Sequence, residues 1–222
     1  MENRNEYQGK IIRTSIALFN LHGERAITTN HIASSLGISP GNLYYHFKNK
    51  EDIIRQIFAL YSEHLNTHFK PLEQHNEPLE QLTQYLDSLF DLMWRYHFFY
   101  DNLTDILARD DELKKNYIAF QSRLLEQVKA VVIGLRDTGV ITIDDDDAKE
   151  LAHMLKMTVS FWTPYVKARR MTGVLEQQDI YNGIVKVLMI FKPYATPMSA
   201  PKVAQLQQHY QALAEASLPS IA

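Results

Sequence analysis

The chain has 222 residues, of which 45% are hydrophobic and 22% are charged, and it contains no cysteine. This length fits one large domain, or a small domain joined to a larger one. The lack of cysteine excludes disulfides, thiolate metal sites and a cysteine nucleophile. No window holds the roughly 18 apolar residues that a membrane span needs, and residues 1–10 have no secretory signal pattern. We therefore expect a cytoplasmic protein without membrane contact.

Charge is unevenly distributed, although the net charge of −3 is small. Residues 1–60 contain seven Lys and Arg residues and five acidic residues, a net charge of +2, so the remainder carries −5. A positive N-terminal segment attracts an anionic partner more than an acidic remainder does. By itself this asymmetry does not identify the partner.

The first 70 residues have the periodicity of four helices. We expect them at residues 12–22, 29–36, 40–47 and from 50 to about 70. The residues that cap or end these helices are Gly23, Thr28 or Thr29, Gly37, Ser39 (followed by Pro40 at the first helical position) and Asn49. Hydroxyl and amide side chains cap helix starts, proline favours the first helical turn and glycine follows helix ends.

The remaining chain is more apolar and is also helical in period. The pattern predicts helices at residues 78–100, 102–109, 113–136 and 178–191, and one that starts at the acidic run 144–147. Acidic side chains are favourable at the positive end of a helix dipole. Residues 203–216 form either a terminal helix or a tail that orders only on contact. The expected fold is all-α.

Residues 27–51 carry the most informative pattern. Two short helices separated by residues 37–39 form a helix-turn-helix, a motif that places its second helix in the major groove of DNA. Thr28 and Thr29 place a hydroxyl and free backbone N–H groups at a helix start, which suits a phosphate oxygen. Five apolar residues are expected to hold the two helices together, namely Ile32, Leu36, Ile38, Leu43 and Phe47.

The second helix of the motif has the chemistry of a DNA-reading helix. It opens with small groups that permit close approach to base edges, from Pro40, Gly41 and Asn42. Aromatic rings with polar tips and mobile positive charges follow, from Tyr44, Tyr45, His46, Lys48 and Lys50. The segment predicts a DNA-binding surface.

The same segment resembles the DNA-binding region of the TetR family of bacterial regulators. That family has the pattern T-x-x-x-I-A, then G-[IV]-S-x-G-x-[LI]-Y-x-[HY]-F-x-x-K-[ED]. The matching residues are Thr28, Ile32, Ala33, Gly37, Ile38, Ser39, Gly41, Leu43, Tyr44, His46, Phe47, Lys50 and Glu51. The resemblance covers about the first 60 residues. It implies a helix-turn-helix DNA-binding domain at residues 1–52, with a connecting helix to about 70, and a helical ligand-binding and dimerisation domain at 71–222.

The resemblance also implies individual DNA contacts. Phosphate contacts are implied for Thr29, Asn42, Tyr44, His46 and Lys50. Base-edge contacts are implied for Asn30, Pro40, Gly41 and Tyr45. Some relatives carry arginine where Asn30 stands, and asparagine suits adenine better, with about 1–3 kcal/mol of discrimination for a bidentate pair. Structural roles are the alternatives: a core position for Tyr44 or Phe47, a helix cap for Thr28, and an exposed surface position for His46 or Lys50.

Residues 94–100 place six aromatic or imidazole rings in seven positions. One interpretation is a hydrophobic core, since aromatic side chains dominate cores. The other is a cavity for a small-molecule effector, with a few polar tips among apolar walls. The candidate lining residues are Trp94, Tyr96, His97, Tyr100, Phe120, Trp162 and Tyr165.

The family resemblance also implies a homodimer, because its members pair through the two helices that precede the tail. Those helices would be about 146–170 and 176–192 here. The interface candidates are Val159, Trp162, Ile184, Val187, Leu188 and Phe191, and burial within one subunit is the alternative for each of them. A paired helix-turn-helix suits a near-palindromic DNA site.

No catalytic motif is present: the chain lacks G-x-S-x-G, a P-loop and a dinucleotide fingerprint. His64 and His68 have helical spacing but lack the glutamate of a zincin motif, and residues 144–147 lack the features of a calcium loop. We expect no metal, no cofactor and no enzymatic activity. The expected function is a ligand-responsive transcriptional regulator, by default a repressor, that a small and partly apolar effector releases from its operator. The alternatives are a helical interaction protein and a small-molecule carrier or enzyme without DNA binding.

Overall fold

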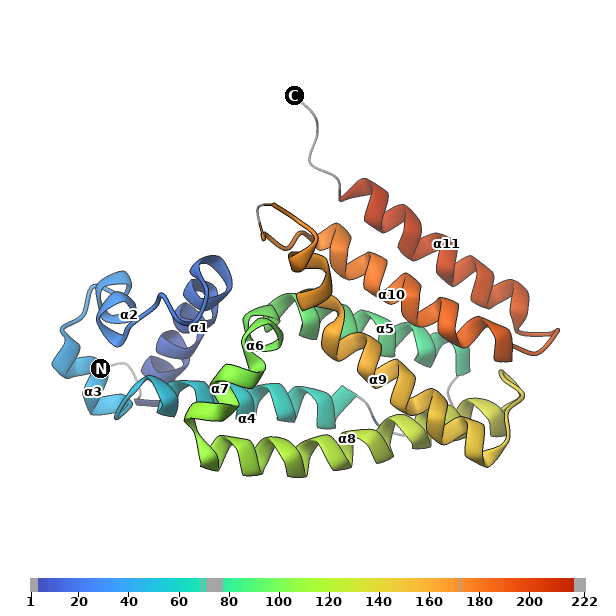
Figure 1. The fold of residues 1–222 in the computed structure, drawn as a ribbon, viewed down its shortest axis with the longest axis horizontal. Coiled ribbons are helices and arrows are strands. Elements are labelled where there is room, and N and C mark those ends of the chain that lie inside the picture. Colours follow the sequence, from blue (N-terminus) through green and yellow to red (C-terminus); the bar gives the residue numbers. More distant parts are fainter. Residues whose placement is uncertain (1–3, 69, 71–77, 172, 218–222) are drawn as a thin grey trace. The chain divides into compact units, whose positions relative to one another are not determined.

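The computed structural model describes residues 4–68, 70, 78–171 and 173–217. These residues form eleven α-helices and one short 3-10 helix, with a single isolated β-bridge and no strand (Figure 1). The all-α fold predicted from the sequence is confirmed. The helices divide into two compact units. Unit 1 comprises Met1–His64 and Arg95–Tyr117, and unit 2 comprises Leu65–Trp94 and Ile118–Ala222.

Unit 1 contains the N-terminal helices and a second, short helical segment. Its helices are α1 (Arg4–His22), α2 (Thr29–Ser35), α3 (Pro40–His46), most of α4 (Lys50–His68), α6 (His97–Asp101), α7 (Leu103–Arg109) and the start of α8 (Asp111–Asp137). The predicted N-terminal signals delimit these helices. Gly23 and Gly37 have φ of 81° and 66°, in the left-handed region that glycine tolerates best. The Asn49 side-chain oxygen accepts a hydrogen bond from the Asp52 N–H at 2.8 Å and so caps α4.

The continuous helix expected at residues 78–100 is wrong. Helix α5 (Pro78–Arg95) ends before Tyr96, where the backbone leaves helical geometry at φ −117° and ψ 25°. The Asn20 side chain, on α1, takes up the backbone groups at this break. Its amide donates to the Arg95 carbonyl at 2.9 Å and its oxygen accepts from the Phe98 N–H at 3.1 Å. A distant side chain thus stabilises a helix end that the local sequence does not show.

Unit 2 is built from α5, most of α8, α9 (Asp145–Ala168), α10 (Gln177–Phe191), the 3-10 helix Lys192–Tyr194 and α11 (Ala200–Ala216). Helices α9, α10 and α11 follow one another in antiparallel order, and α10 lies between and beside the other two (Figure 1). The Asp144 carboxylate caps α9 by accepting from the Asp147 N–H at 2.8 Å, as the acidic run predicts. Helix α11 packs on α10, so residues 203–216 belong to a packed helix and not to a free tail.

Tyr210 anchors α11 in the core of unit 2. Its side chain is fully buried, and its hydroxyl donates to the Asp87 carboxylate on α5 at 2.6 Å. Burial and the bond to Asp87 raise the pKa of this phenol, so it stays protonated as a donor. The terminal helix thus closes one side of the hydrophobic core.

Trp162 on α9 packs directly against α10. Its ring nitrogen donates to the Asp179 carbonyl at 2.6 Å. A Cβ atom added at Gly183 would lie 2.7 Å from the Trp162 ring, closer than real side chains approach. Glycine at this position therefore allows the two helices to meet.

We predict that Gly183→Ala lowers the free energy of unfolding by about 1–3 kcal/mol, because the indole cannot retreat without losing its bond to Asp179. Chemical denaturation measures this change. The matched control is Gly9→Ala on α1, where the added Cβ meets only the flexible end of Arg13 at 3.3 Å. The control should be neutral or slightly stabilising, since alanine favours helix more than glycine. Equal stability of Gly183→Ala and the wild type would contradict the close packing.

Candidate nucleic-acid interface

Helices α2 and α3 form a helix-turn-helix. The turn is closed by the Ile38 N–H, which donates to the Ala33 carbonyl at 3.0 Å. Ile32, Leu43 and Phe47 are buried between the helices, as predicted, while Leu36 and Ile38 are only partly buried. Two seven-residue helices are too short to be stable alone, so this shared core supplies their stability.

Polar side chains fix both helix starts. The Thr28 hydroxyl accepts from the His31 N–H, and the His31 ring accepts from the Thr28 N–H, each at 3.3 Å. Thr28 is therefore a helix cap, one of the two roles considered for it. At the start of α3, the Ser39 hydroxyl accepts from the Asn42 N–H at 3.2 Å. Both starts present the remaining backbone N–H groups of a first helical turn.

One side of α3 is exposed. The exposed residues are Pro40, Gly41, Asn42, Tyr44 and Tyr45. Thr28 and Asn30 are also exposed, and Thr29 is half-buried. The Tyr44 hydroxyl lies 3.0 Å from the Thr29 hydroxyl, so these two predicted phosphate-binding groups form one polar site across the two helices. Tyr44 is 49% exposed, which favours a surface role over a core position.

His46 is less accessible than its predicted role requires. Its ring stacks on Tyr7 of α1, with centroids 5.4 Å apart and planes 13° apart, and the Tyr45 ring meets it edge-on. The end of α3 therefore packs on the first turns of α1. The predicted phosphate contact from His46 stays a prediction.

Lys50 is bound inside unit 1. Its ammonium lies 2.8 Å from a Glu24 carboxylate oxygen and 3.1 Å from the carbonyls of Glu24 and Ile27. An ammonium has three N–H donors, and these three acceptors match them. A phosphate contact from Lys50 would require exchange of one of these partners.

The carboxylate of Glu24 has no exposure to water. Arg109 on α7 is its second cation, at 2.6 Å. The neighbouring Arg25 pairs with Asp105, one helical turn before Arg109, and donates to its two carboxylate oxygens from Nε and Nη2. This bond, together with the positive charge of Arg25, lowers the pKa of Asp105. Two consecutive residues of the α1–α2 loop are thus paired with α7.

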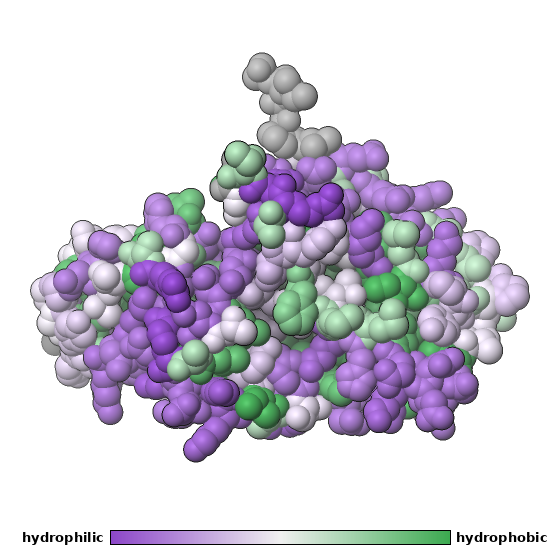
Figure 2. Space-filling view, in the orientation of Figure 1, coloured by the Kyte–Doolittle hydropathy of each residue, from purple (hydrophilic) through white to green (hydrophobic). Residues whose placement is uncertain are grey.

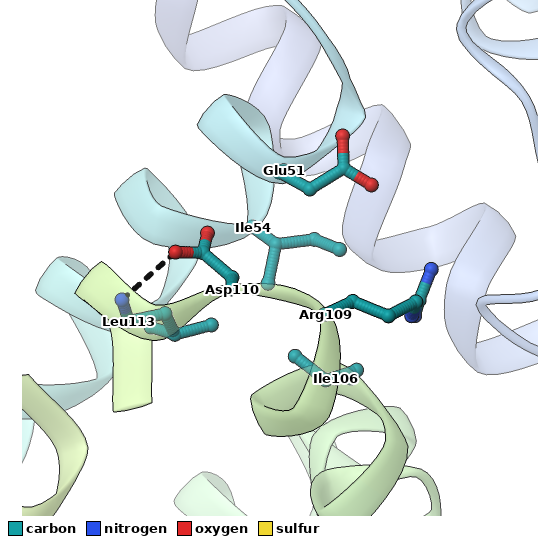
Figure 3. A pocket seen from close by; sticks show the side chains of 6 residues that line it. All are labelled: Glu51, Ile54, Ile106, Arg109, Asp110 and Leu113. Carbon is teal, nitrogen blue, oxygen red and sulfur yellow. Dashed lines mark hydrogen bonds between the residues drawn. The ribbon is translucent and has the colours of Figure 1, made fainter. Parts of the chain in front are cut away.

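A small pocket lies beside this network, between α4, α7 and the start of α8 (Figure 3). It has about 180 Å³ of empty space, part of it open to solvent. Its lining residues are Glu51, Ile54, Ile106, Arg109, Asp110 and Leu113. Asp110 accepts from the Leu113 N–H at 3.0 Å, the bond drawn in Figure 3, and from Arg55 at 2.7 Å. Two of the polar lining residues, Arg109 and Asp110, thus already have charged partners.

The aromatic run of residues 94–100 is divided between the two units, with Trp94 in unit 2 and the other rings in unit 1. In unit 1, Tyr96, His97 and Tyr100 are buried, and the hydroxyls of Tyr61 and Tyr100 lie 3.0 Å apart. Burial raises the pKa of both of these phenols, and that of Tyr117 to about 12, so all three remain neutral. Phe58 and Phe99 stack among these rings. This cluster is a packed core with two buried hydroxyls.

The other effector candidates lie in unit 2. Trp94 and Trp162 pack against one small apolar cluster, and the Tyr165 ring lies 5.8 Å from Trp162. Phe120 is buried on α8, whereas Tyr165 is 51% exposed. The proposed lining thus falls into two sets.

Sequence reasoning missed the ionic network of unit 1. Glu24, Arg25, Asp105 and Arg109 match no motif, and 80 or more residues separate each acid from its arginine. The one available signal was Glu24 itself, next to a glycine that ends a helix.

No group of three or more potential metal-ligating side chains occurs within the described residues. In the same part of the chain, no helix is both long and apolar enough to cross a bilayer.

A capped short helix, a glycine turn and a second short helix with an exposed face define a helix-turn-helix DNA-binding protein. The chain belongs to the TetR family. The family model described as bacterial regulatory proteins, tetR family, matches residues 11–57, and the model described as a bacterial transcriptional repressor matches residues 60–203. The protein is therefore a transcriptional regulator and not an enzyme.

Curated relatives match a part of the chain. The repressor KstR2 of Mycobacterium tuberculosis is 32% identical over 78 residues, which are 32% of this chain and 39% of KstR2. The HTH-type regulator YerO of Bacillus subtilis is 50% identical over 50 residues, 22% of this chain and 17% of YerO. The matched region thus spans well under half the length of these relatives.

Solved structures match nearly the whole chain. A TetR-family regulator from Marinobacter aquaeolei is 36% identical, with a TM-score of 0.81, over 95% of this chain and 100% of that one. A regulator from Saccharomonospora viridis, solved in complex with choline, shares the fold at 17% identity and a TM-score of 0.61, over 95% and 96% of the two chains.

We predict that Lys50→Ala lowers the free energy of unfolding by about 3 kcal/mol, because it leaves the buried Glu24 carboxylate with one cation instead of two. Denaturant titration of the full chain measures the loss. Lys48→Ala is the matched control, since Lys48 is exposed on the same segment, and it should change stability by no more than about 0.5 kcal/mol. Similar effects of the two substitutions would show that Lys50 has no structural role.

Proposed function

We propose that the protein is a ligand-responsive repressor that binds a near-palindromic operator as a homodimer and is released by a small, partly apolar effector. The observation that carries the DNA-binding part is the exposed side of α3, which a buried helix-turn-helix core holds in place. Membership of the TetR family supports repression as the direction of control.

The proposed DNA surface contains two kinds of contact. Thr29, Asn42 and Tyr44 bind phosphate, since Thr29 and Tyr44 present a pair of hydroxyls and the Asn42 side chain is exposed at the start of α3. Asn30, with Pro40 and Gly41, faces base edges, because these residues are exposed at the starts of α2 and α3. Lys50 supports this surface by holding the α1–α2 loop.

We predict that Asn30→Ala relaxes base preference at one operator position and leaves the salt dependence of binding unchanged, because a base contact carries sequence information and no charge. Selection from a random duplex library gives the preference, and binding titrations at several salt concentrations give the salt slope. A shift of preference spread over the whole site would contradict the assignment. If the wild type bound no duplex in a salt-sensitive way, the proposed function would be wrong.

The homodimer rests on an exposed apolar stripe on α9. Met154, Met157, Phe161 and Tyr165 recur at spacings of three and four residues, so they share one side of the helix, and each is between 47% and 65% exposed. Figure 2 shows green surface in the region where Figure 1 draws α9, with purple surface around it. Monomeric proteins rarely expose an apolar patch of this kind. We propose that a second copy of the chain covers it.

The proposed interface differs from the candidates that the family resemblance implied. Ile184, Leu188 and Phe191 are buried in the core of unit 2, and Val159, Trp162 and Val187 pack partly against its apolar clusters. Their burial within one subunit, the alternative considered above, is what the structure shows for the first three. The outward side of α9 replaces them in the proposal.

We predict that Phe161→Glu converts the dimer to a monomer, because the interface would then bury an unpaired carboxylate. Sedimentation velocity measures the mass, and operator affinity should fall together with the dimer, since a half-site is bound more weakly than a pair. The control is Met198→Glu, at a methionine that is 86% exposed outside the stripe. A monomeric wild type, or a dimer that resists Phe161→Glu, would contradict this interface.

The effector site stays a proposal with two alternatives. One is the buried set Tyr96, His97 and Tyr100 in unit 1, where the Tyr61 and Tyr100 hydroxyls lie among aromatic rings. The other is the unit 2 set of Trp94, Phe120, Trp162 and Tyr165. The pocket in Figure 3 has essentially no room for a water molecule, so we assign no effector to it. The choline-bound relative supports a small-molecule site in this fold.

We propose two domains: a DNA-binding domain at residues 1–52, with a connecting helix to about 70, and a ligand-binding and dimerisation domain at 71–222. The effector acts by population shift: it binds better to a state in which the two DNA-binding parts no longer match successive major grooves, about 34 Å apart. An effector with equal affinity for both states would change nothing.

A further inference from the structure

The first turn of α1 meets the end of α3. The Arg4 guanidinium lies over the ring of Tyr45, 5.4 Å from its centroid, and both side chains are exposed. One turn further along α1, Tyr7 stacks on His46. Two consecutive residues of α3 thus each pair with one residue of α1.

The residues proposed above to contact DNA supply little positive charge, although Lys48 is exposed just after α3. Thr29, Asn30, Asn42 and Tyr44 are neutral, and the ammonium of Lys50 already has three acceptors in unit 1. Neutralisation of phosphates by lysine and arginine supplies most of the general affinity for DNA. Arg4 is an exposed cation that contacts Tyr45 of α3.

We propose that Arg4 binds the DNA backbone, and that Tyr45 is a positioning residue that holds its guanidinium at the edge of the α3 surface. The proposal rests on the DNA-binding function proposed above, and it extends the DNA surface to α1. It also gives the Tyr45 ring a role other than base contact.

The chemistry of arginine suits this arrangement. A guanidinium that stacks on an aromatic ring uses its flat face, while its five N–H donors lie in the plane of the group and stay available for phosphate oxygens. Helix stability does not explain the position, because a cation in the first turn of a helix opposes the helix dipole. Arg4 therefore gains little from the helix in which it lies.

Arg4→Gln in the full-length protein tests the proposal. The probes are a duplex that the wild type selects from a random library and a duplex of random sequence, both titrated at several salt concentrations. We expect roughly threefold to tenfold weaker binding to both duplexes, and a salt slope smaller by about 0.9 for each protomer bound. Arg13→Gln is the matched control: Arg13 is exposed on the opposite side of α1, nine residues away, and its slope should equal that of the wild type.

The role of Tyr45 is tested by removing Arg4 in two further backgrounds. With Tyr45→Phe the ring remains, so Arg4→Gln should weaken binding as much as it does in the wild type. With Tyr45→Ala the platform is lost, so the same substitution should have less than half of that effect. Unfolding transitions of all variants establish that each is folded before binding is compared.

Three results would overturn the proposal. They are an unchanged salt slope for Arg4→Gln, an equal loss for Arg13→Gln, and an equal effect of Arg4→Gln in the Tyr45→Ala background. In each case a wild type that binds DNA with a steep salt dependence would leave the proposed function intact. Absence of salt-dependent binding by the wild type would instead contradict the proposed function itself.

Discussion

A carboxylate without contact to water must be neutralised by its neighbours, and the loop between α1 and α2 is built around one, that of Glu24. Lys50 from α4 and Arg109 from α7 supply the opposite charges. The loop leads directly into α2, so the position of the helix-turn-helix depends on both cations. Because α7 holds one of them, the DNA-binding helices and the segment Arg95–Tyr117 belong to one compact unit, although a long stretch of sequence separates them.

Local sequence signals predict the DNA-binding helices well. Thr28, Gly37 and Asn49 act on the residues beside them, so caps and turns are readable without knowledge of the fold. The exposed side of α3 also follows from the sequence, since Leu43 is its one apolar residue of core type. What the family motif adds is the assignment of that exposed side to DNA.

Features that depend on distant partners could not be predicted. Helix α5 ends at Arg95 because Asn20 binds the freed backbone groups, and nothing in residues 78–100 indicates this. Lys50 matches the family motif, yet the sequence does not show that Glu24 binds its ammonium. On α9, helical spacing selects Val159 and Trp162 but does not tell that this side of the helix packs toward α10. Candidate DNA contacts were thus more accessible to sequence reasoning than the dimer surface or an effector site.

The sparse packing of α3 has an evolutionary consequence. Leu43 is the one buried residue of this helix, so most of its other positions can be exchanged without loss of core contacts. Substitutions there should be nearly neutral for folding while they alter the DNA surface. After gene duplication, two copies of such a regulator can therefore diverge in the DNA sites that they recognise while both remain folded, with the Glu24 network held constant in each.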